Sequence, residues 1–196
     1  MDKIFKLLWG LRAFSYKLIF GRFVMPGYIG PPIFLFGTRR MFIGKRVRIF
    51  PGMRSECHGS GRLFIHDNVS IGQNFHVICS GELHIGEGCL LSGNVFVTDT
   101  DHTYTDVSRP VFEQPNVINK TELGTNCFIG IGVRIQAGTI LGKGCVVGAN
   151  SVVRGHFPDH SVIVGAPARI VKRYNPATVT WERVHSPDNI FSAHNK

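Results

Sequence analysis

The residue with the clearest capacity for chemistry in this sequence is a histidine, His102, within a polar stretch. It stands in segment 98–116, TDTDHTYTDVSRPVFEQPN, which lacks the regular hydrophobic spacing found on either side. A neutral imidazole can accept a proton as a general base, and Asp99 could orient the ring or hold a substrate through a carboxylate hydrogen bond. Asn94 precedes His102 by eight residues. An ordinary explanation also exists, because a histidine in a polar loop is usually solvated and Asp-Thr-Asp is typical of turns.

Metal and thiol chemistry are less well supported by the sequence. A zinc site needs about three converging ligands, whereas no C-x-x-C pair occurs and His76, His84 and His102 do not form an H-x4-H pair. Three of the five cysteines occupy small inward positions of the repeat described below, where a thiol packs as a small apolar group. We therefore expect no bound metal, and free thiols in a reducing compartment.

The elements that must position His102 follow from a six-residue repeat on both sides of its segment. An aliphatic residue recurs at every sixth position from Val117 to Val153, and interrupted runs begin at Ile43, Ile65 and Ile85. A period of six fits neither an α-helix nor simple strand alternation, and β-branched anchors favour short strands. Three hexads make one triangular turn of a solenoid, so the sequence predicts stacked parallel strands around aliphatic ladders. An insertion in such a stiff scaffold must project as a loop.

The chain is therefore predicted to be all-β apart from its amino terminus. We expect a basic amphipathic helix over 1–25, a Pro/Gly linker over 26–40, a hexapeptide-repeat β-helix over 41–168 with an inserted loop over 98–116, and a C-terminal tail over 169–196.

Positive charge is concentrated at the amino terminus. Residues 1–54 contain 11 Lys and Arg and one acidic residue, Asp2, while the remaining residues contain 11 basic and 12 acidic residues. Apolar residues keep helical spacing from Ile4 to Ile19, and the frequent charges exclude a spanning helix and a secretory signal. Such a helix suits an anionic inner membrane surface; packing on the solenoid or on a partner subunit is the alternative. No recognised nucleic-acid-binding motif accompanies the charge, so we expect no nucleic-acid partner.

Over 65–174 the sequence resembles the left-handed β-helix (hexapeptide-repeat) acyltransferases, especially the sugar O-acetyltransferases of bacterial surface-polysaccharide assembly. The resemblance rests on the hexads, on the spacing in NVFVTDTDH, and on the closing segments VGANSVV and IVGAPARIVKRYN. It implies a left-handed parallel β-helix that transfers an acetyl group from acetyl-CoA to a sugar hydroxyl of an O-antigen, capsule or exopolysaccharide. It further implies a homotrimer. From the core thiols and the basic helix we expect a cytoplasmic protein with peripheral contact at the inner membrane surface.

The same resemblance assigns roles to individual residues. His102 matches the general base, which would act without a covalent enzyme intermediate, and Asn94 and Asp99 are expected to contact the acceptor. The residues expected to bind acetyl-CoA, the last two near its phosphates, are Phe128, Gly130, Ile131, Ala149, Arg154, Arg169 and Lys172.

Two other classes of function remain open. A nucleotide-amino-sugar N-acetyltransferase would use the same mechanism with an amine acceptor. A β-helix without transferase activity, either a zinc enzyme or a structural prism, is the other class. The basic helix is absent from the soluble galactoside and maltose acetyltransferases, which favours a lipid-linked oligosaccharide acceptor over a free sugar.

Overall fold

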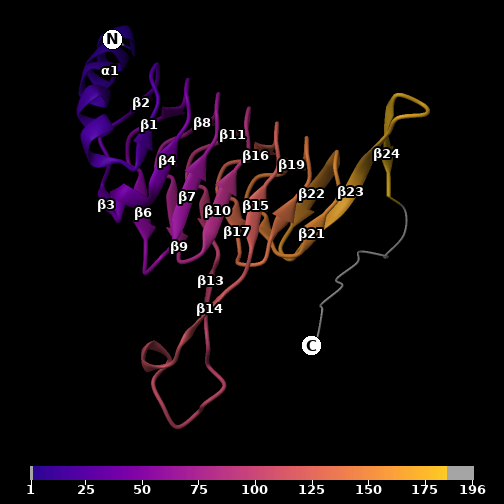
Figure 1. Ribbon diagram of the computed structural model, residues 1–196. Helices are drawn as coiled ribbons and strands as arrows, with labels where there is room; N and C mark the ends of the chain where they lie inside the picture. The colour runs from indigo at the N-terminus through magenta and orange to yellow at the C-terminus, as the bar shows by residue number, and fades with distance from the viewer. Residues whose placement is uncertain (1, 185–196) are drawn as a thin grey trace.

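The computed structural model describes residues 2–184; positions 185–196 of the predicted tail lie outside this range. Three parallel sheets, here called walls A, B and C, wrap around one axis as a prism (Figure 1). In each turn the chain passes from wall A to wall B to wall C and then returns to wall A one strand further along. The prism therefore has three edges, named A–B, B–C and C–A after the walls that meet there.

Each wall takes one strand from every turn, except that the last turn gives no strand to wall C. Wall A contains β1 (Arg22–Phe23), β4 (Met41–Ile43), β7 (Arg62–Ile65), β10 (Glu82–Ile85), β15 (Thr121–Leu123), β18 (Ile140–Leu141) and β21 (His156–Phe157). Wall B contains β2 (Tyr28–Ile29), β5 (Arg48–Ile49), β8 (Ser70–Ile71), β11 (Leu90–Leu91), β16 (Phe128–Ile129), β19 (Val146–Val147) and β22 (Ser161–Gly165). Wall C contains β3 (Phe34–Phe36), β6 (Arg54–Cys57), β9 (His76–Cys79), β12 (Phe96–Thr98), β17 (Arg134–Ile135) and β20 (Val152–Val153).

The inward side chain of each strand stacks on its counterpart in the next turn, which builds one apolar ladder per wall. On wall A the ladder is Ile43, Ile65, Ile85, Leu123, Leu141 and Phe157. On wall B it is Ile29, Ile49, Ile71, Leu91, Ile129, Val147 and Ile163. From Ile43 to Val147 the ladder residues are the hexad anchors of the sequence, and the predicted fold class is confirmed.

The small inward positions of the repeat are filled as the sequence indicates. Cys89, Cys127 and Cys145 are each at most 1% exposed. Cys57 and Cys79 are also buried, and all five cysteines are free thiols. The thiols therefore belong to the core.

The structure differs from the sequence prediction at two boundaries of the prism. The predicted linker contains β2 and β3, which complete a first turn begun by β1. Gly30 brings the chain so close to the second turn that a Cβ there would lie 2.6 Å from the nitrogen of Pro51, so this glycine serves close stacking rather than flexibility. Val117, the first residue of the unbroken hexad run, is 47% exposed and lies outside the ladders.

Helix α1 (Asp2–Ile19) covers the first turn of the prism. Ala13 and Tyr16 are buried against it, and the Trp9 ring lies 5.6 Å from that of Tyr28 on β2. An Arg12 guanidinium nitrogen donates to the carbonyl of Ile29 at 2.6 Å. The helix thus shields the open end of the ladders, as a capping element does in repeat proteins.

At the opposite end the parallel stacking stops. β22 pairs antiparallel with β23 (Ala168–Asn175), which pairs antiparallel with β24 (Thr180–Arg183). The described part of the predicted tail is therefore a continuation of wall B.

Candidate active site

His102 lies on an arm that projects from the prism. β13 (Thr100–His102) and β14 (Asn116–Ile118) form an antiparallel ladder in which His102 is opposite Asn116. Because β12 of wall C precedes the arm and β15 of wall A follows it, the arm leaves at the C–A edge (Figure 1). The side chain of His102 is exposed, so it is available to a substrate.

Asp99 occupies the root of the arm but faces inward. Its residue is 1% exposed. One carboxylate oxygen accepts from the Ser80 amide at 2.9 Å and the Thr100 hydroxyl at 2.7 Å, and the other accepts from the Gly81 amide at 2.9 Å. The carboxylate thus holds the turn between β9 and β10, in contrast to the expected contact with His102 or an acceptor.

Asn94 lies at the B–C edge, between β11 and β12. Its φ of 60° is the left-handed conformation that asparagine tolerates better than most residues. Its side-chain oxygen accepts from the Asn74 amide at 3.1 Å, and its carbonyl accepts from Arg134 at 2.5 Å. Asn94 is therefore a corner residue whose exposed side chain is still accessible to a ligand.

Most of the residues expected to bind acetyl-CoA fall on wall B and its B–C edge. Phe128 and Lys172 share one outward column, through Val146 and Val162. With strands about 4.8 Å apart, that column is roughly 14 Å long between the two residues. The B–C edge carries Gly130, Ile131 and Ala149, and Arg169 continues it on β23 opposite Val164.

Glycine is required at this edge. A Cβ on Gly130 would lie 2.7 Å from the Ala149 backbone nitrogen in the next turn. The absence of a side chain keeps the two turns in contact. Phe128 and Ile131 remain 41% and 48% exposed beside it. The edge therefore presents backbone and apolar surface to solvent.

Arg154 stands apart from this group. It follows β20 at the C–A edge, where a guanidinium nitrogen lies 2.7 Å from the Asp101 carboxylate on the arm. The structure therefore places Arg154 with the arm rather than with the other six residues. Sequence spacing alone did not distinguish this edge from the B–C edge.

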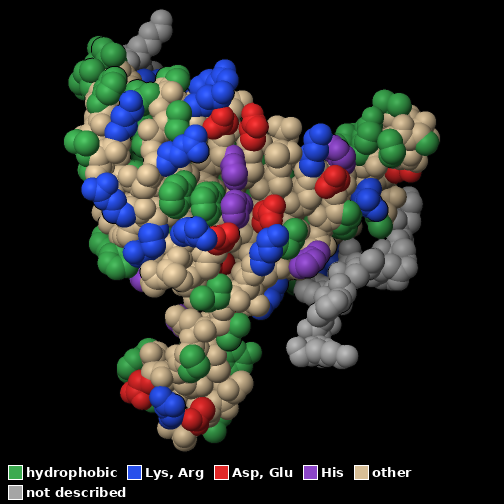
Figure 2. Space-filling view, in the orientation of Figure 1, with side chains coloured by type: hydrophobic (Ala, Val, Ile, Leu, Met, Phe, Trp, Pro, Cys, Tyr) green, Lys and Arg blue, Asp and Glu red, His purple; other side chains and the backbone are tan. Residues whose placement is uncertain are grey.

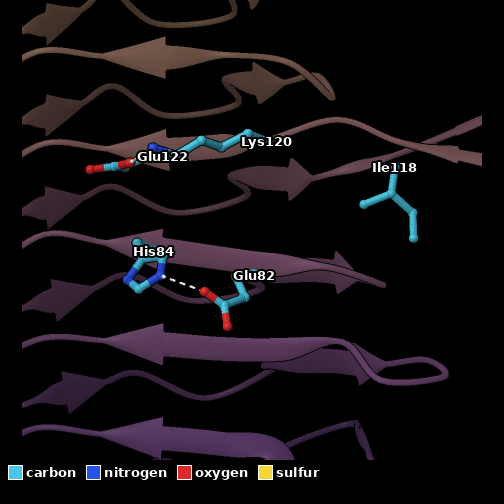
Figure 3. A pocket seen from close by; sticks show the side chains of 5 residues that line it. All are labelled: Glu82, His84, Ile118, Lys120 and Glu122. Carbon is cyan, nitrogen blue, oxygen red and sulfur yellow. Dashed lines mark ion pairs between the residues drawn. The ribbon is translucent and has the colours of Figure 1, made fainter.

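A hollow of about 450 Å³ on wall A adjoins the root of the arm (Figure 3). It is lined by Glu82, His84, Ile118, Lys120 and Glu122. Lys120 pairs with Glu122 at 2.9 Å, and His84 lies 3.9 Å from Glu82. Burial lowers the pKa of His84, and the adjacent His66 lowers it further, which favours the neutral imidazole. This cluster was not predicted from the sequence, where its signal is the charge at outward hexad positions of β10 and β15.

Within a single chain, the residues expected to form the site lie on two different edges of the prism. His102 and the hollow lie at the C–A edge, whereas Asn94 and Gly130 lie at the B–C edge. Wall C separates the two edges.

Within residues 2–184, no group of three or more His, Cys, Asp or Glu side chains is arranged to hold a metal ion. In the same range, no helix combines the length and the apolar character needed to cross a membrane.

Comparisons with known proteins agree on the type of repeat. Residues 120–155 match the family model "Bacterial transferase hexapeptide (six repeats)". Over 140 residues, covering 67% of this chain and 71% of the relative, the sequence is 37% identical to an Escherichia coli (strain K12) protein named as a lipopolysaccharide biosynthesis O-acetyl transferase, WbbJ. It is 30% identical over 152 residues, 78% of this chain and 73% of the relative, to one named as a colanic acid biosynthesis acetyltransferase, WcaF, of the same strain.

A solved structure shows the same fold. An AntD variant from Bacillus cereus, described as an N-acyltransferase in complex with dTDP-4-amino-4,6-dideoxyglucose and coenzyme A, superposes with a TM-score of 0.73. The match covers 86% of this chain and 91% of that one, at 19% identity.

Proposed function

The chain belongs to the bacterial hexapeptide-repeat acyltransferases, and from that premise we propose that it is an acetyl-CoA-dependent O-acetyltransferase. Its proposed acceptor is a sugar hydroxyl of a bacterial surface polysaccharide under assembly. The observation that carries the proposal is the exposed His102 on the projecting arm, together with the B–C edge, where glycine leaves room for the pantetheine chain of acetyl-CoA. The names of the relatives WbbJ and WcaF support the same class of acceptor.

His102 is the proposed general base. A sugar hydroxyl is a weak nucleophile, so a neutral imidazole would remove its proton while the oxygen attacks the thioester carbonyl carbon. The carbon–sulfur bond then breaks, and the protonated imidazole returns the proton to the departing thiolate of CoA. The products are the sugar ester and free CoA.

Direct transfer is favoured because the core holds every cysteine. Each of the five thiols is at most 1% exposed, so none presents a nucleophile that could carry the acetyl group. The acetyl group would therefore pass from CoA to the sugar oxygen in one displacement.

Acetyl-CoA is proposed to lie along wall B and the B–C edge. Gly130 and Ala149 would let the pantetheine arm approach the backbone, and Phe128 and Ile131 would contact it with apolar surface. Arg169 and Lys172 would bind the phosphates at the far end of the same wall. Asn94, on that edge, would contact the acceptor.

A homotrimer would bring the two edges together. The arm carries large exposed apolar side chains, namely Tyr104 (76%), Val107 (98%) and Phe112 (83%), and exposed apolar groups on a projecting element are typical of a subunit contact. We propose that His102 of one subunit faces the B–C edge of the next. The hollow beside the arm would then add carboxylates that can accept hydrogen bonds from sugar hydroxyls.

The proposed location is the cytoplasm, at the inner face of the membrane. Five free thiols fit a reducing compartment. A lipid-linked oligosaccharide is the acceptor that this location favours.

The test is release of free CoA from acetyl-CoA by purified protein with lipid-linked glycans, nucleotide amino sugars and free sugars as acceptors. We expect turnover on a lipid-linked glycan and a loss of about 10²- to 10⁴-fold in His102→Ala. His156→Ala, an exposed histidine on β21, is the matched control and should retain activity. Turnover only on amino-sugar nucleotides would replace the proposed O-acetylation with N-acetylation. An active His102→Ala variant would rule out His102 as the general base.

Subunit complementation tests the shared site. His102→Ala and Ala149→Trp should each be inactive alone, because the second blocks the exposed B–C edge. Co-expressed, they should regain part of the activity, since some sites would combine an intact His102 with an intact edge. Mixtures that stay inactive would place the site within one chain.

A further inference from the structure

Helix α1 has apolar side chains on two opposite faces, and the prism covers only one of them. Trp9, Ala13 and Tyr16 follow helical spacing on the covered face. The other face carries six large apolar side chains at spacings of three or four residues, with one adjacent pair. Its members are Ile4 (64% exposed), Leu7 (65%), Leu8 (54%), Leu11 (59%), Phe14 (58%) and Leu18 (74%).

This outer face of α1 is unusual for a helix at the end of a soluble prism. A helix that only caps a solenoid needs one apolar stripe toward the core and a polar face toward water. Here the side toward water is as apolar as the side toward the core. A contiguous exposed stripe of this kind marks an interaction surface.

The charge around the outer face points to the occupant. No Asp or Glu occurs between Lys3 and Arg54. Lys17 lies over the Phe14 ring at 5.8 Å, and Arg22 and Arg39 are exposed near the end of the helix. Figure 2 shows blue side chains between the green ones at this end of the molecule, with the red ones beginning farther along.

Two copies of this surface would repel one another. Docking α1 against α1 of a second copy would bring together two ends that each carry excess positive charge, without acidic groups from 3–54 to compensate. An anionic surface has the opposite charge and also accepts an apolar stripe. Phospholipid bilayers with anionic headgroups combine both properties.

We propose that the outer face of α1 binds the surface of an anionic phospholipid membrane, with the helix axis in the plane of the interface. Ile4, Leu7, Leu11 and Leu18 enter the headgroup–acyl boundary, and the neighbouring Lys and Arg contact lipid phosphates. The prism then stands on the membrane by its amino-terminal end. The binding itself does not depend on the proposed enzymatic function, but it gives that function a reason to use a lipid-linked acceptor.

The experiment is co-sedimentation of the full chain with vesicles of phosphatidylglycerol and phosphatidylethanolamine, compared with vesicles of phosphatidylcholine alone. The test variant is Leu7→Glu/Leu18→Glu, which changes two residues that are 65% and 74% exposed and should leave the fold intact. The matched control is Ala177→Glu/Val179→Glu, which makes the same charge change at two exposed residues in the turn between β23 and β24, away from α1 and from the arm. Circular dichroism and acetyl-CoA turnover on a water-soluble acceptor are recorded for all three proteins.

We expect the wild type and the control variant to bind the anionic vesicles about tenfold more tightly than the neutral ones. Leu7→Glu/Leu18→Glu should bind at least about tenfold more weakly than the control, with unchanged circular dichroism. Binding by wild type should weaken as salt rises.

Three results would overturn the proposal. One is wild-type protein that stays in the supernatant, and another is a test variant that binds as well as the control. The third is a larger mass of the wild type in sedimentation that the Leu7→Glu/Leu18→Glu variant lacks and that added vesicles do not reduce. Such a result would make the outer face of α1 a contact between copies of the chain. Turnover on the soluble acceptor reports separately on the proposed enzymatic function.

Discussion

Asp99 and His102 are three residues apart, yet they lie in opposite environments. The carboxylate of Asp99 is buried and accepts three hydrogen bonds, whereas the imidazole of His102 is exposed on the arm. The difference arises because Asp99 still belongs to the coil, while His102 has already left it. A polar residue beside a catalytic candidate can therefore serve the scaffold alone.

Replacing Asp99 by Ala should destabilise the protein before it affects catalysis. The variant leaves the partly buried amides of Ser80 and Gly81 without their acceptor, and each such group costs about 1–3 kcal/mol. We expect the free energy of unfolding in urea to fall by about 2–4 kcal/mol. Asp101→Ala, which removes one half-exposed ion pair, should change it by less than about 1 kcal/mol. Full stability with a raised KM for acceptor would instead make Asp99 a binding residue.

At the scale of elements, the orientation of the arm depends on its contact with the prism. Asp101 on β13 pairs with Arg154, which follows β20 two turns further along wall C. This ion pair connects the arm to the rigid C–A edge of the prism. Because His102 is the next residue after Asp101, loss of the ion pair between Asp101 and Arg154 moves the imidazole.

Reversing the charge of Arg154 in this ion pair tests whether the residue positions the arm. Arg154→Asp places two carboxylates together, so we expect kcat to fall by about tenfold while KM for acetyl-CoA stays the same. The double variant Asp101→Arg/Arg154→Asp should recover most of the activity. Steady-state kinetics with varied acetyl-CoA is the measurement. If KM for acetyl-CoA rises in Arg154→Asp and the double variant does not restore it, Arg154 instead binds the phosphates of CoA.

β6 carries the carboxylate with the clearest pH response. Burial favours the protonated form of Glu56, but hydrogen bonds from Arg54 (2.6 Å) and His58 (3.1 Å) outweigh it and hold the pKa of the carboxyl below its ordinary value of 4.5. His76 also lies 3.7 Å from this carboxylate. A lowered pKa in the folded state means that the stabilisation is complete above pH 4.5 and is lost as the pH falls through the folded-state value.

Glu56→Gln should therefore be less stable than wild type at pH 7, and its stability should fall less steeply between pH 5 and pH 3. Urea unfolding measured at intervals of pH gives both curves. Parallel curves over the acid range would show that Glu56 contributes nothing to the pH dependence.

For the whole molecule, the sequence predicts the prism better than it predicts the site. The ladders could be predicted because each hexad anchor is a local choice repeated every turn, such as Ile129 and Ile135. The first turn was missed because its glycines and prolines, including Gly30, resemble a linker until the neighbouring turn is present. The position of Arg154 at the C–A edge, apart from the other residues expected to bind acetyl-CoA, could not be predicted because spacing does not reveal which edge a residue occupies.

The amino-terminal end gives a prediction for the whole molecule. Tyr16 and Phe14 are aromatic residues on one helix, but Tyr16 is 5% exposed under the prism and Phe14 is 58% exposed on the opposite face. Tyr16→Ala should lower the free energy of unfolding by about 3 kcal/mol, since it opens a cavity over the first ladder residues. Phe14→Ala should change it by less than about 0.5 kcal/mol.

Hydrogen exchange locates the effect of Tyr16→Ala within the prism. Turns of a solenoid contact only their neighbours, so loss of the cap should expose the amides of β1 and β2 first and leave those of β16 and β19 protected. Equal stabilities of the two variants would mean that α1 does not cap the prism. If the cap holds, the same helix joins the ladders through one face and leaves the other for a membrane, and the stability of the first turn then rises when the helix is bound to lipid.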